Sequence, residues 1–177
     1  MKVLLPTLLL LFAFLPCFGQ NNTGSAQKFY YEIKQQADSM GHWLLEKNIE
    51  KFLRYTSPKV LSNMGGKEKM AQVMDSAFKN MEKEGTIFLS VSFGHPSKII
   101  NIRNELQCTL PQIIEMRVPN GRLITHSTLI VISEDYGKSW HFVDTSGKDI
   151  QAMQVLLPNL STELIIPEKP KNIFYEN

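Results

Sequence analysis

Cysteine is scarce in this chain, whose 177 residues include two, Cys17 and Cys108. Cys17 lies in an apolar N-terminal segment that we expect to be removed, which would leave Cys108 alone. A single cysteine cannot form an internal disulfide, so a small domain held together by disulfides is excluded. The neighbours Leu106 and Leu110 predict that Cys108 is a buried thiol that packs as a small apolar side chain.

The sequence also lacks the motifs of common catalytic and cofactor sites. It contains no His-Glu-x-x-His, no Gly-x-Ser-x-Gly and no Cys-x-x-Cys. Gly65-Gly66-Lys67 lacks the earlier glycine and the following Ser or Thr of a phosphate-binding loop. The histidines are scattered, and His42 and Glu46, which could share one helix face, have no third ligand at a useful spacing. We therefore expect neither a metal nor a cofactor.

An excess of charge of one sign is absent as well. Lys and Arg number 19 against 17 Asp and Glu, a formal net charge of +2, and there is no basic run. The sequence therefore does not predict a basic patch of the kind that binds nucleic acid or an anionic membrane surface. After the N-terminal segment, no apolar run is long enough to span a membrane.

The N-terminal segment predicts export. Lys2 precedes an apolar run over residues 3–15, and the small residues Cys17 and Gly19 stand at the −3 and −1 positions of a cleavage site. This arrangement is typical of a secretory signal peptide over residues 1–19 that is cleaved after Gly19. We expect an exported protein, either periplasmic or extracellular. Lipid attachment at Cys17 is disfavoured because Pro16 stands where lipoprotein signals carry a small residue.

The remaining sequence predicts one domain that begins with helices. We expect a flexible leader over residues 20–25, a single α+β domain over 26–158 and an extended, proline-containing tail over 159–177. A long first helix is predicted by apolar residues three and four apart, namely Tyr30, Ile33, Ala37, Met40 and Leu44. Ser57-Pro58 predicts a helix start. The apolar stripe over residues 70–81 predicts a helix that faces the core.

After Gly85 the apolar period changes from that of a helix to that of a strand. Alternation predicts a strand over residues 87–93, and short apolar runs predict further strands over 99–102 and 139–143. Long strands over 106–118 and 123–133 are joined by the turn Pro119-Asn120-Gly121. A short helix is predicted over 150–157. Helices followed by hairpins indicate an α+β domain in which helices pack on one face of a curved antiparallel sheet.

This order of elements resembles the NTF2-like superfamily, an α+β cone also called cystatin-like or SnoaL-like. The resemblance covers most of residues 27–144. It rests on the long first helix, the run of hairpins and a segment similar to the family's second helix, Asn48-Ile49-Glu50-Lys51-Phe52-Leu53-Arg54-Tyr55-Thr56. Where the family usually has a short strand pair after this segment, the present sequence starts a helix with Pro58. Members include isomerases, dehydratases and simple binders, so the resemblance implies a cone without fixing the function.

A second resemblance is confined to one turn. Ser133-Glu134-Asp135-Tyr136-Gly137-Lys138-Ser139-Trp140 is similar to the Asp-box of sialidase propellers, S-x-D-x-G-x-[ST]-W. Propellers need several copies, and this chain has one. We therefore interpret the segment as a hairpin turn in which Asp135 accepts backbone hydrogen bonds, Gly137 takes a strained conformation and Trp140 packs beneath.

Candidates for acid–base chemistry are weak, and none is assigned as catalytic. Resemblance to a conical fold implies an acid or base that points into the cone, and Glu115 and His126 stand in the middle of predicted strands. Glu115 alternates with Arg117, which favours the outer, solvated face of the sheet. His126 shares its face with Ile124 and Ile130, which suits a pocket or a core histidine.

Weak candidates for ligand binding are His126 together with Trp43 and Tyr55, two aromatic residues that could line the open end of the cone. Aromatic residues of this kind more often pack in a core than bind a ligand.

Three functions from different classes remain open. The favoured one is an exported domain that binds a small apolar ligand or a protein partner without catalysis. The second is an enzyme of the ketosteroid-isomerase or SnoaL kind that uses His126 or Glu115, and it requires an acid or base at the bottom of an apolar pocket. The third is a structural or assembly subunit that forms a homodimer through the open sheet face. The binding function requires an open cavity of roughly a few hundred Å³.

Overall fold

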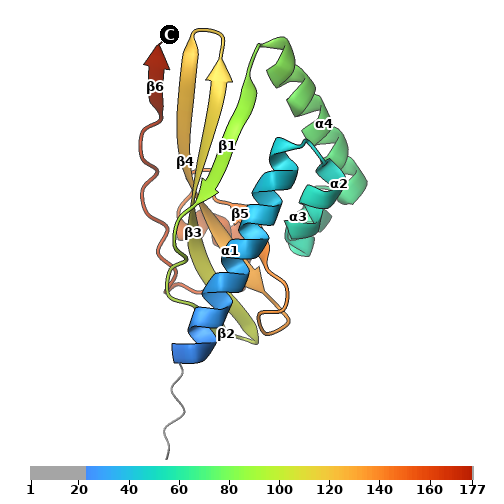
Figure 1. Ribbon diagram of the computed structural model, residues 1–177. Helices are drawn as coiled ribbons and strands as arrows, with labels where there is room; N and C mark the ends of the chain where they lie inside the picture. The colour runs from blue at the N-terminus through green and yellow to red at the C-terminus, as the bar shows by residue number, and fades with distance from the viewer. Residues whose placement is uncertain (1–22, 177) are drawn as a thin grey trace, which may run out of the picture.

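The computed structural model describes residues 23–176, which form an α+β fold (Figure 1). The predicted signal peptide over 1–19 and residues 20–22 of the predicted leader lie outside the described residues. The N-terminal helices are α1 (Thr23–Leu45), α2 (Ile49–Phe52), the 3₁₀ turn η1 (Leu53–Tyr55), α3 (Pro58–Asn63) and α4 (Lys67–Lys83). The short helix α5 (Ile150–Leu156) lies near the C-terminus. No helix within residues 23–176 has the combination of length and apolar character that a membrane span requires.

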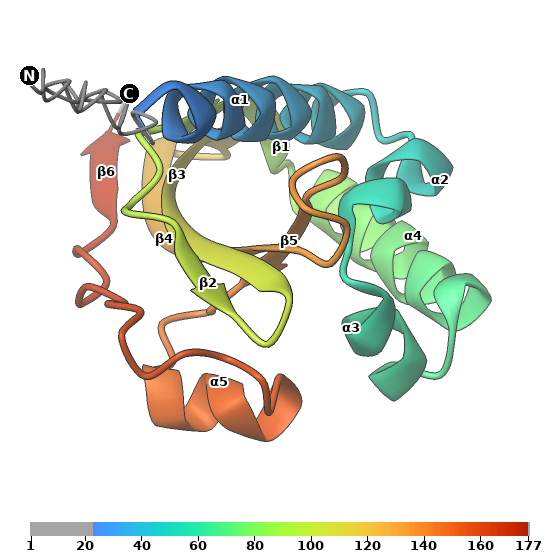
Figure 2. The same cartoon turned by 90° about the horizontal axis from the view of Figure 1, so that it is seen from below.

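Six strands form one curved antiparallel sheet that does not close, which confirms the predicted fold class. The strands are β1 (Ile87–Phe93), β2 (Ile100–Ile102), β3 (Glu105–Val118), β4 (Gly121–Ser133), β5 (His141–Asp144) and β6 (Ile173–Glu176). The long hairpin β3–β4 is shared by two halves of the sheet. One half has the order β1-β3-β4-β6 and the other β2-β3-β4-β5. Figure 2 shows the sheet curving around the side on which α1 lies.

The main core lies between α1 and one face of the sheet. Ile33, Ala37 and Met40 of α1 are buried there with side chains from β3, β4 and β5 and with Trp140. The predicted helical spacing is therefore confirmed. The helix runs through Gly41 without interruption, and a Cβ atom at this position would lie 3.0 Å from the Phe93 ring, so glycine permits the close approach of α1 to β1.

A second core lies on the opposite face of the sheet. Its β4 members Ile130 and Ile132 alternate with residues that face α1, and they pack against α5 and the segment that follows it. Helix α1 therefore lies on one face of the sheet, as expected, and the short helix α5 lies on the other. The segment after residue 158 contributes Leu160 and Leu164 to this core, and β6 then pairs with β4. Residues predicted as an extended tail are thus partly packed into the fold.

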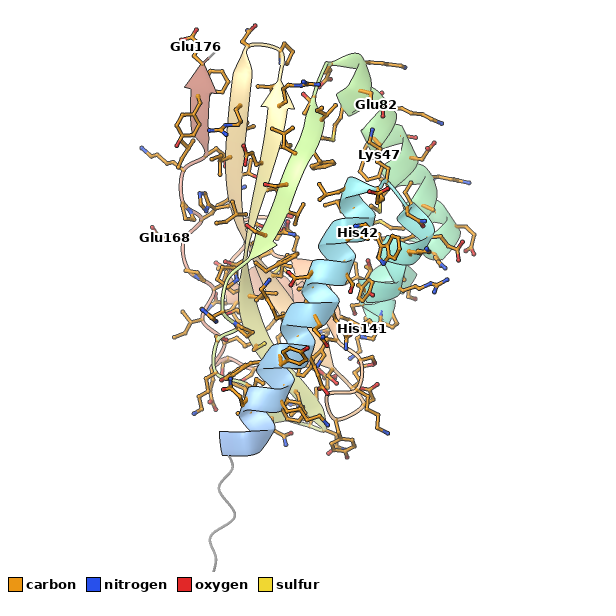
Figure 3. All side chains as sticks on the ribbon, viewed as in Figure 1. His42, Lys47, Glu82, His141, Glu168 and Glu176 are labelled. Atoms are coloured by element: carbon orange, nitrogen blue, oxygen red, sulfur yellow. The ribbon has the colours of Figure 1, made fainter. Side chains whose placement is uncertain are left out.

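Helix α4 differs from its prediction as a core helix. No residue of α4 is buried, and Val73 remains 45% exposed. Its apolar stripe is half covered because α4 packs mainly on the short helices α2 and α3 and meets the sheet through one edge-to-face pair, Phe78 on Phe88, with ring centroids 6.0 Å apart. An ion pair between Lys47 and Glu82 ties α4 to the end of α1 (Figure 3).

Cys108 is fully buried in the main core, as predicted. Burial raises the pKa of its thiol to about 12, which lowers the fraction of reactive thiolate at pH 8 by roughly a thousandfold relative to an ordinary cysteine. We expect a disulfide-exchange reagent such as DTNB to modify the native protein at least about a hundredfold more slowly than the urea-unfolded protein. Modification at the same rate in both states would contradict the burial of Cys108.

Candidate functional site

A cavity of about 530 Å³ lies at the edge of the sheet beside β5. One wall comes from the helical segment of residues 49–70 and includes Phe52 and Val60, and the other comes from α5 and includes Met153. Figure 2 shows α3 and α4 to one side of β5 and α5 below it. The volume falls within the range of about 300–1,000 Å³ that is typical of small-molecule sites.

The floor of the cavity is apolar because both cores reach this edge. Phe142 belongs to the main core and is 4% exposed, whereas its neighbour Val143 belongs to the second core and is 6% exposed. Successive residues of a strand point to opposite faces, so the end of β5 presents apolar side chains from both sides of the sheet. Met70 of α4 and Leu156 of α5 add partly buried apolar surface.

The charged groups of the cavity lie on its rim, whereas the polar residue Thr56 is partly buried. Asp144, Ser146 and Lys148 line the rim and are exposed. Asp144 is the last residue of β5, and Ser146 and Lys148 belong to the turn between β5 and α5. This turn is closed by a hydrogen bond from the Lys148 backbone N–H to the Thr145 carbonyl (2.9 Å). Ser146 and Gly147 have φ values of 53° and 77°, which fits a type I′ turn. The Asp144 carboxylate accepts the Ser146 backbone N–H at 2.6 Å, so the turn is held by its own side chain.

This arrangement suits binding better than acid–base chemistry. The titratable groups that line the cavity, Asp144 and Lys148, are both exposed at the rim, while the residues of the floor are apolar. A general acid or base is expected within hydrogen-bonding reach of a substrate held in the pocket, where burial can tune its pKa. Among the described residues, no group of three His, Cys, Asp or Glu side chains is placed to hold a metal ion.

Glu115 and His126 lie away from this cavity. Both point to the sheet face opposite α1, because Glu115 pairs with Ile124 and His126 with Ile113 in the β3–β4 register. Glu115 accepts a salt bridge from Arg122 (2.9 Å) and a hydrogen bond from the Ser90 hydroxyl (3.3 Å). Neither side chain lines the cavity.

Trp43 and Tyr55 also lie outside the cavity lining. Trp43 stacks beneath the Lys51 ammonium, which is 3.9 Å from its ring centroid. Tyr55 packs against Phe142 with ring centroids 6.5 Å apart. It therefore contacts a residue of the cavity floor without lining the cavity itself. The structure does not bring these two aromatic residues together with His126.

The buried apolar residues that form the floor of the cavity were not predicted as a site from the sequence, because their patterns are those of ordinary core residues. Met153 and Leu156 fit the apolar stripe of a short helix, and Phe142 fits a strand. The cavity lies between the helical segment of residues 49–70 and α5, which are about 90 residues apart in sequence. No local sequence pattern indicates how far apart these two segments lie in the folded protein.

A buried polar network near α5 is structural. The Glu105 carboxylate accepts hydrogen bonds from Lys59 (2.9 Å), Asn159 (3.0 Å) and Gln107 (2.7 Å). Burial alone would raise the pKa of Glu105, but these three donors outweigh it and hold the pKa below its ordinary value. Gln107 also accepts the Ser161 backbone N–H (2.9 Å), so the network fastens the segment after α5 to β3. Its partners are mutually satisfied, which favours a structural role.

No protein-family model matches this chain, and no curated protein sequence matches it.

Proposed function

We propose that this protein is an exported, non-catalytic binding domain that takes a small apolar ligand into the cavity beside β5. The observation that supports this function is that apolar and charged residues occupy different parts of the cavity. Its floor is built from the buried apolar residues Phe142, Val143 and Met153, and its charged groups stand on the exposed rim. Such a site gains its binding free energy from apolar burial and uses few polar groups for orientation.

The acid–base alternative receives no comparable support. Glu115 is held in an ion pair with Arg122 on the opposite face of the sheet, and His126 lies on that same face. The resemblance of the sequence to the NTF2-like superfamily is compatible with a binder, since that superfamily includes proteins without catalysis.

The direct test is to ask whether the purified protein binds an apolar molecule. We expect the neutral fluorescent probe N-phenyl-1-naphthylamine to bind with saturable emission, and native mass spectrometry to report its stoichiometry as one per chain. Absence of saturable binding at probe concentrations up to its solubility limit would overturn the proposed function.

Filling the cavity gives a residue-specific prediction. Ala152 lines the cavity and is exposed, so the indole of Ala152→Trp can enter the space without displacing a core side chain. We expect probe affinity to fall at least about tenfold, which corresponds to roughly 1.4 kcal/mol of binding free energy. The matched control is Gln151→Trp, one residue earlier on α5 and exposed outside the lining, which should leave affinity unchanged. Equal losses in both variants would place the probe elsewhere.

A further inference from the structure

Strand β6 ends one half of the sheet with an open edge. It pairs with β4 along its inner side, from Ile124 opposite Ile173 to Gly121 opposite Glu176. Its outer side has no strand partner among residues 23–176. All four residues are exposed, and the three apolar ones, Ile173, Phe174 and Tyr175, are 44%, 51% and 47% exposed. Figure 1 shows β6 at the side of the sheet away from α1–α4.

The other edges of the sheet are protected. β1 carries a register shift between Phe88 and Ser90 and packs alongside α1. β2 is three residues long, and β5 is bridged by Thr56 at Phe142. Bulges, short strands and covering segments are the usual devices by which proteins prevent edge-to-edge pairing. β6 is also short, with four residues, but it contains neither proline nor lysine, and its pairing with β4 has no register shift. Its side chains are exposed, so its edge is the one left available.

The strand is also held in a fixed orientation. A Cβ atom at Gly121 would lie 2.0 Å from the Tyr175 carbonyl oxygen, so glycine at this position is what allows β6 to approach β4. The Arg122 guanidinium stands 5.1 Å from the centre of the Tyr175 ring. β6 therefore presents its outer hydrogen-bonding groups as part of the sheet.

We propose that the β6 edge is a homodimer interface in which a second copy adds its own β6 in antiparallel orientation. A two-fold axis perpendicular to a sheet sets one residue opposite its own counterpart, because side chains alternate between the faces. Centring the axis on Phe174 pairs the two Phe174 side chains and sets Ile173 opposite Tyr175. It also sets the Asn172 amide opposite the Glu176 carboxylate at the strand end labelled in Figure 3.

Neighbouring registers are less favourable. Centring on Ile173 brings Pro170, which has no N–H, into the pairing. Centring on Tyr175 places the Glu176 carboxylate opposite Phe174, so an apolar pair is lost. The Phe174 register is the one in which apolar residues of each copy meet apolar residues of the other, as stable cross-strand pairs require. Two short strands cover less area than the roughly 1,600 Å² of a standard interface, so we expect a weak dimer whose dissociation constant is micromolar or higher.

The register is tested by a cysteine on the proposed axis. Residues opposite each other in an antiparallel pair have Cα atoms about 4.5–5.5 Å apart, within the span of a disulfide. We expect Phe174→Cys to form a covalent dimer under mild oxidation. The control Tyr136→Cys, at a residue 67% exposed and far from β6 in sequence, should stay monomeric under denaturing electrophoresis. Cys108 is buried and does not compete.

Light scattering of the unmodified protein completes the test. We expect mass to rise from monomer to dimer with concentration, and Phe174→Asp to raise the dimer dissociation constant at least about tenfold because it sets two carboxylates face to face. Circular dichroism identifies a variant that has lost its fold. A monomer at several hundred micromolar, open-ended aggregates in place of a dimer, or cross-linking no faster for Phe174→Cys than for Tyr136→Cys would each overturn the proposal.

Discussion

Replacing Trp140 with alanine should cost about 3–5 kcal/mol of unfolding free energy, the largest loss we expect from one substitution in this chain. Trp140 is 1% exposed and is the largest of the fully buried side chains. It packs in the main core with Cys108 and Leu110, and the Phe29 ring of α1 meets it edge to face at 5.9 Å. Its removal would leave a cavity between α1 and the sheet that the surrounding strands cannot close.

Trp140→Phe separates packing from hydrogen bonding. The indole N–H has no acceptor within residues 23–176, so phenylalanine removes no internal hydrogen bond and keeps most of the apolar contact. We expect a loss below about 2 kcal/mol for this variant. Urea unfolding followed by circular dichroism measures both values. A loss below about 1.5 kcal/mol for Trp140→Ala would contradict the central position of this residue.

Val73→Ala tests the truncation of an apolar side chain that lies outside the core. Val73 belongs to the cleanest apolar stripe of the sequence, yet it is 45% exposed on α4. Truncation there should change the unfolding free energy by less than about 0.5 kcal/mol. The contrast with Trp140 tests the finding that α4 contributes little to the core.

Local patterns predicted the elements of this fold well. The spacing of Ile33, Ala37 and Met40 identified the buried face of α1, and alternation identified β1. The long strands β3 and β4 were predicted on either side of the turn at residues 119–121. These features are set by residues close together in sequence, because helix and strand periods place every third or fourth, or every second, side chain on one face.

Features that depend on distant segments were not predictable in this way. Periodicity showed that α4 has an apolar face but could not show that the face would remain half exposed. β6 was missed because its four residues follow a proline-containing segment and none of them is buried. The cavity was missed because it is defined by the space between α3 and α5. In each case the feature depends on whether segments that are far apart in the chain contact one another.

The turn at residues 133–140 was predicted in more detail than any other part of the fold. Asp135 Oδ1 accepts hydrogen bonds from the Ser139 and Lys138 backbone N–H groups at 2.9 and 3.1 Å and from the Ser133 hydroxyl at 2.8 Å. Oδ2 accepts the Ser139 hydroxyl at 2.5 Å. Gly137 has a φ of 87°, and a Cβ atom there would lie 2.3 Å from the Phe29 ring.

The turn also positions α1, a role that its sequence does not reveal. The Gln36 side chain of α1 accepts the Trp140 backbone N–H at 2.9 Å and donates to the Lys138 carbonyl at 3.3 Å. One amide therefore bridges the helix to both residues that flank Ser139. The hairpin chemistry fixes the backbone to which α1 attaches and places Trp140 beneath it.

Asp135→Ala should therefore destabilise the protein by about 2–3 kcal/mol near neutral pH, since several donors lose a charged acceptor together. Burial alone would raise the pKa of Asp135, but the bonds from Ser139, Ser133 and Lys138 lower it to about 2. The unfolded value is near 3.9, so the unfolded state binds the proton more readily. The stabilisation is complete above about pH 5 and is lost as the pH falls toward 2.

Urea unfolding at pH 6 and at pH 2.5 tests both the size and the sign of this effect. The difference between the unmodified protein and Asp135→Ala should be largest at pH 6 and smaller at pH 2.5. Asp75→Ala is the control, because Asp75 makes an exposed pair with Lys79 within α4 and its removal should cost less than about 0.5 kcal/mol. An Asp135→Ala loss that stayed the same at both pH values would mean that Asp135 stabilises the turn through its shape and not through its charge.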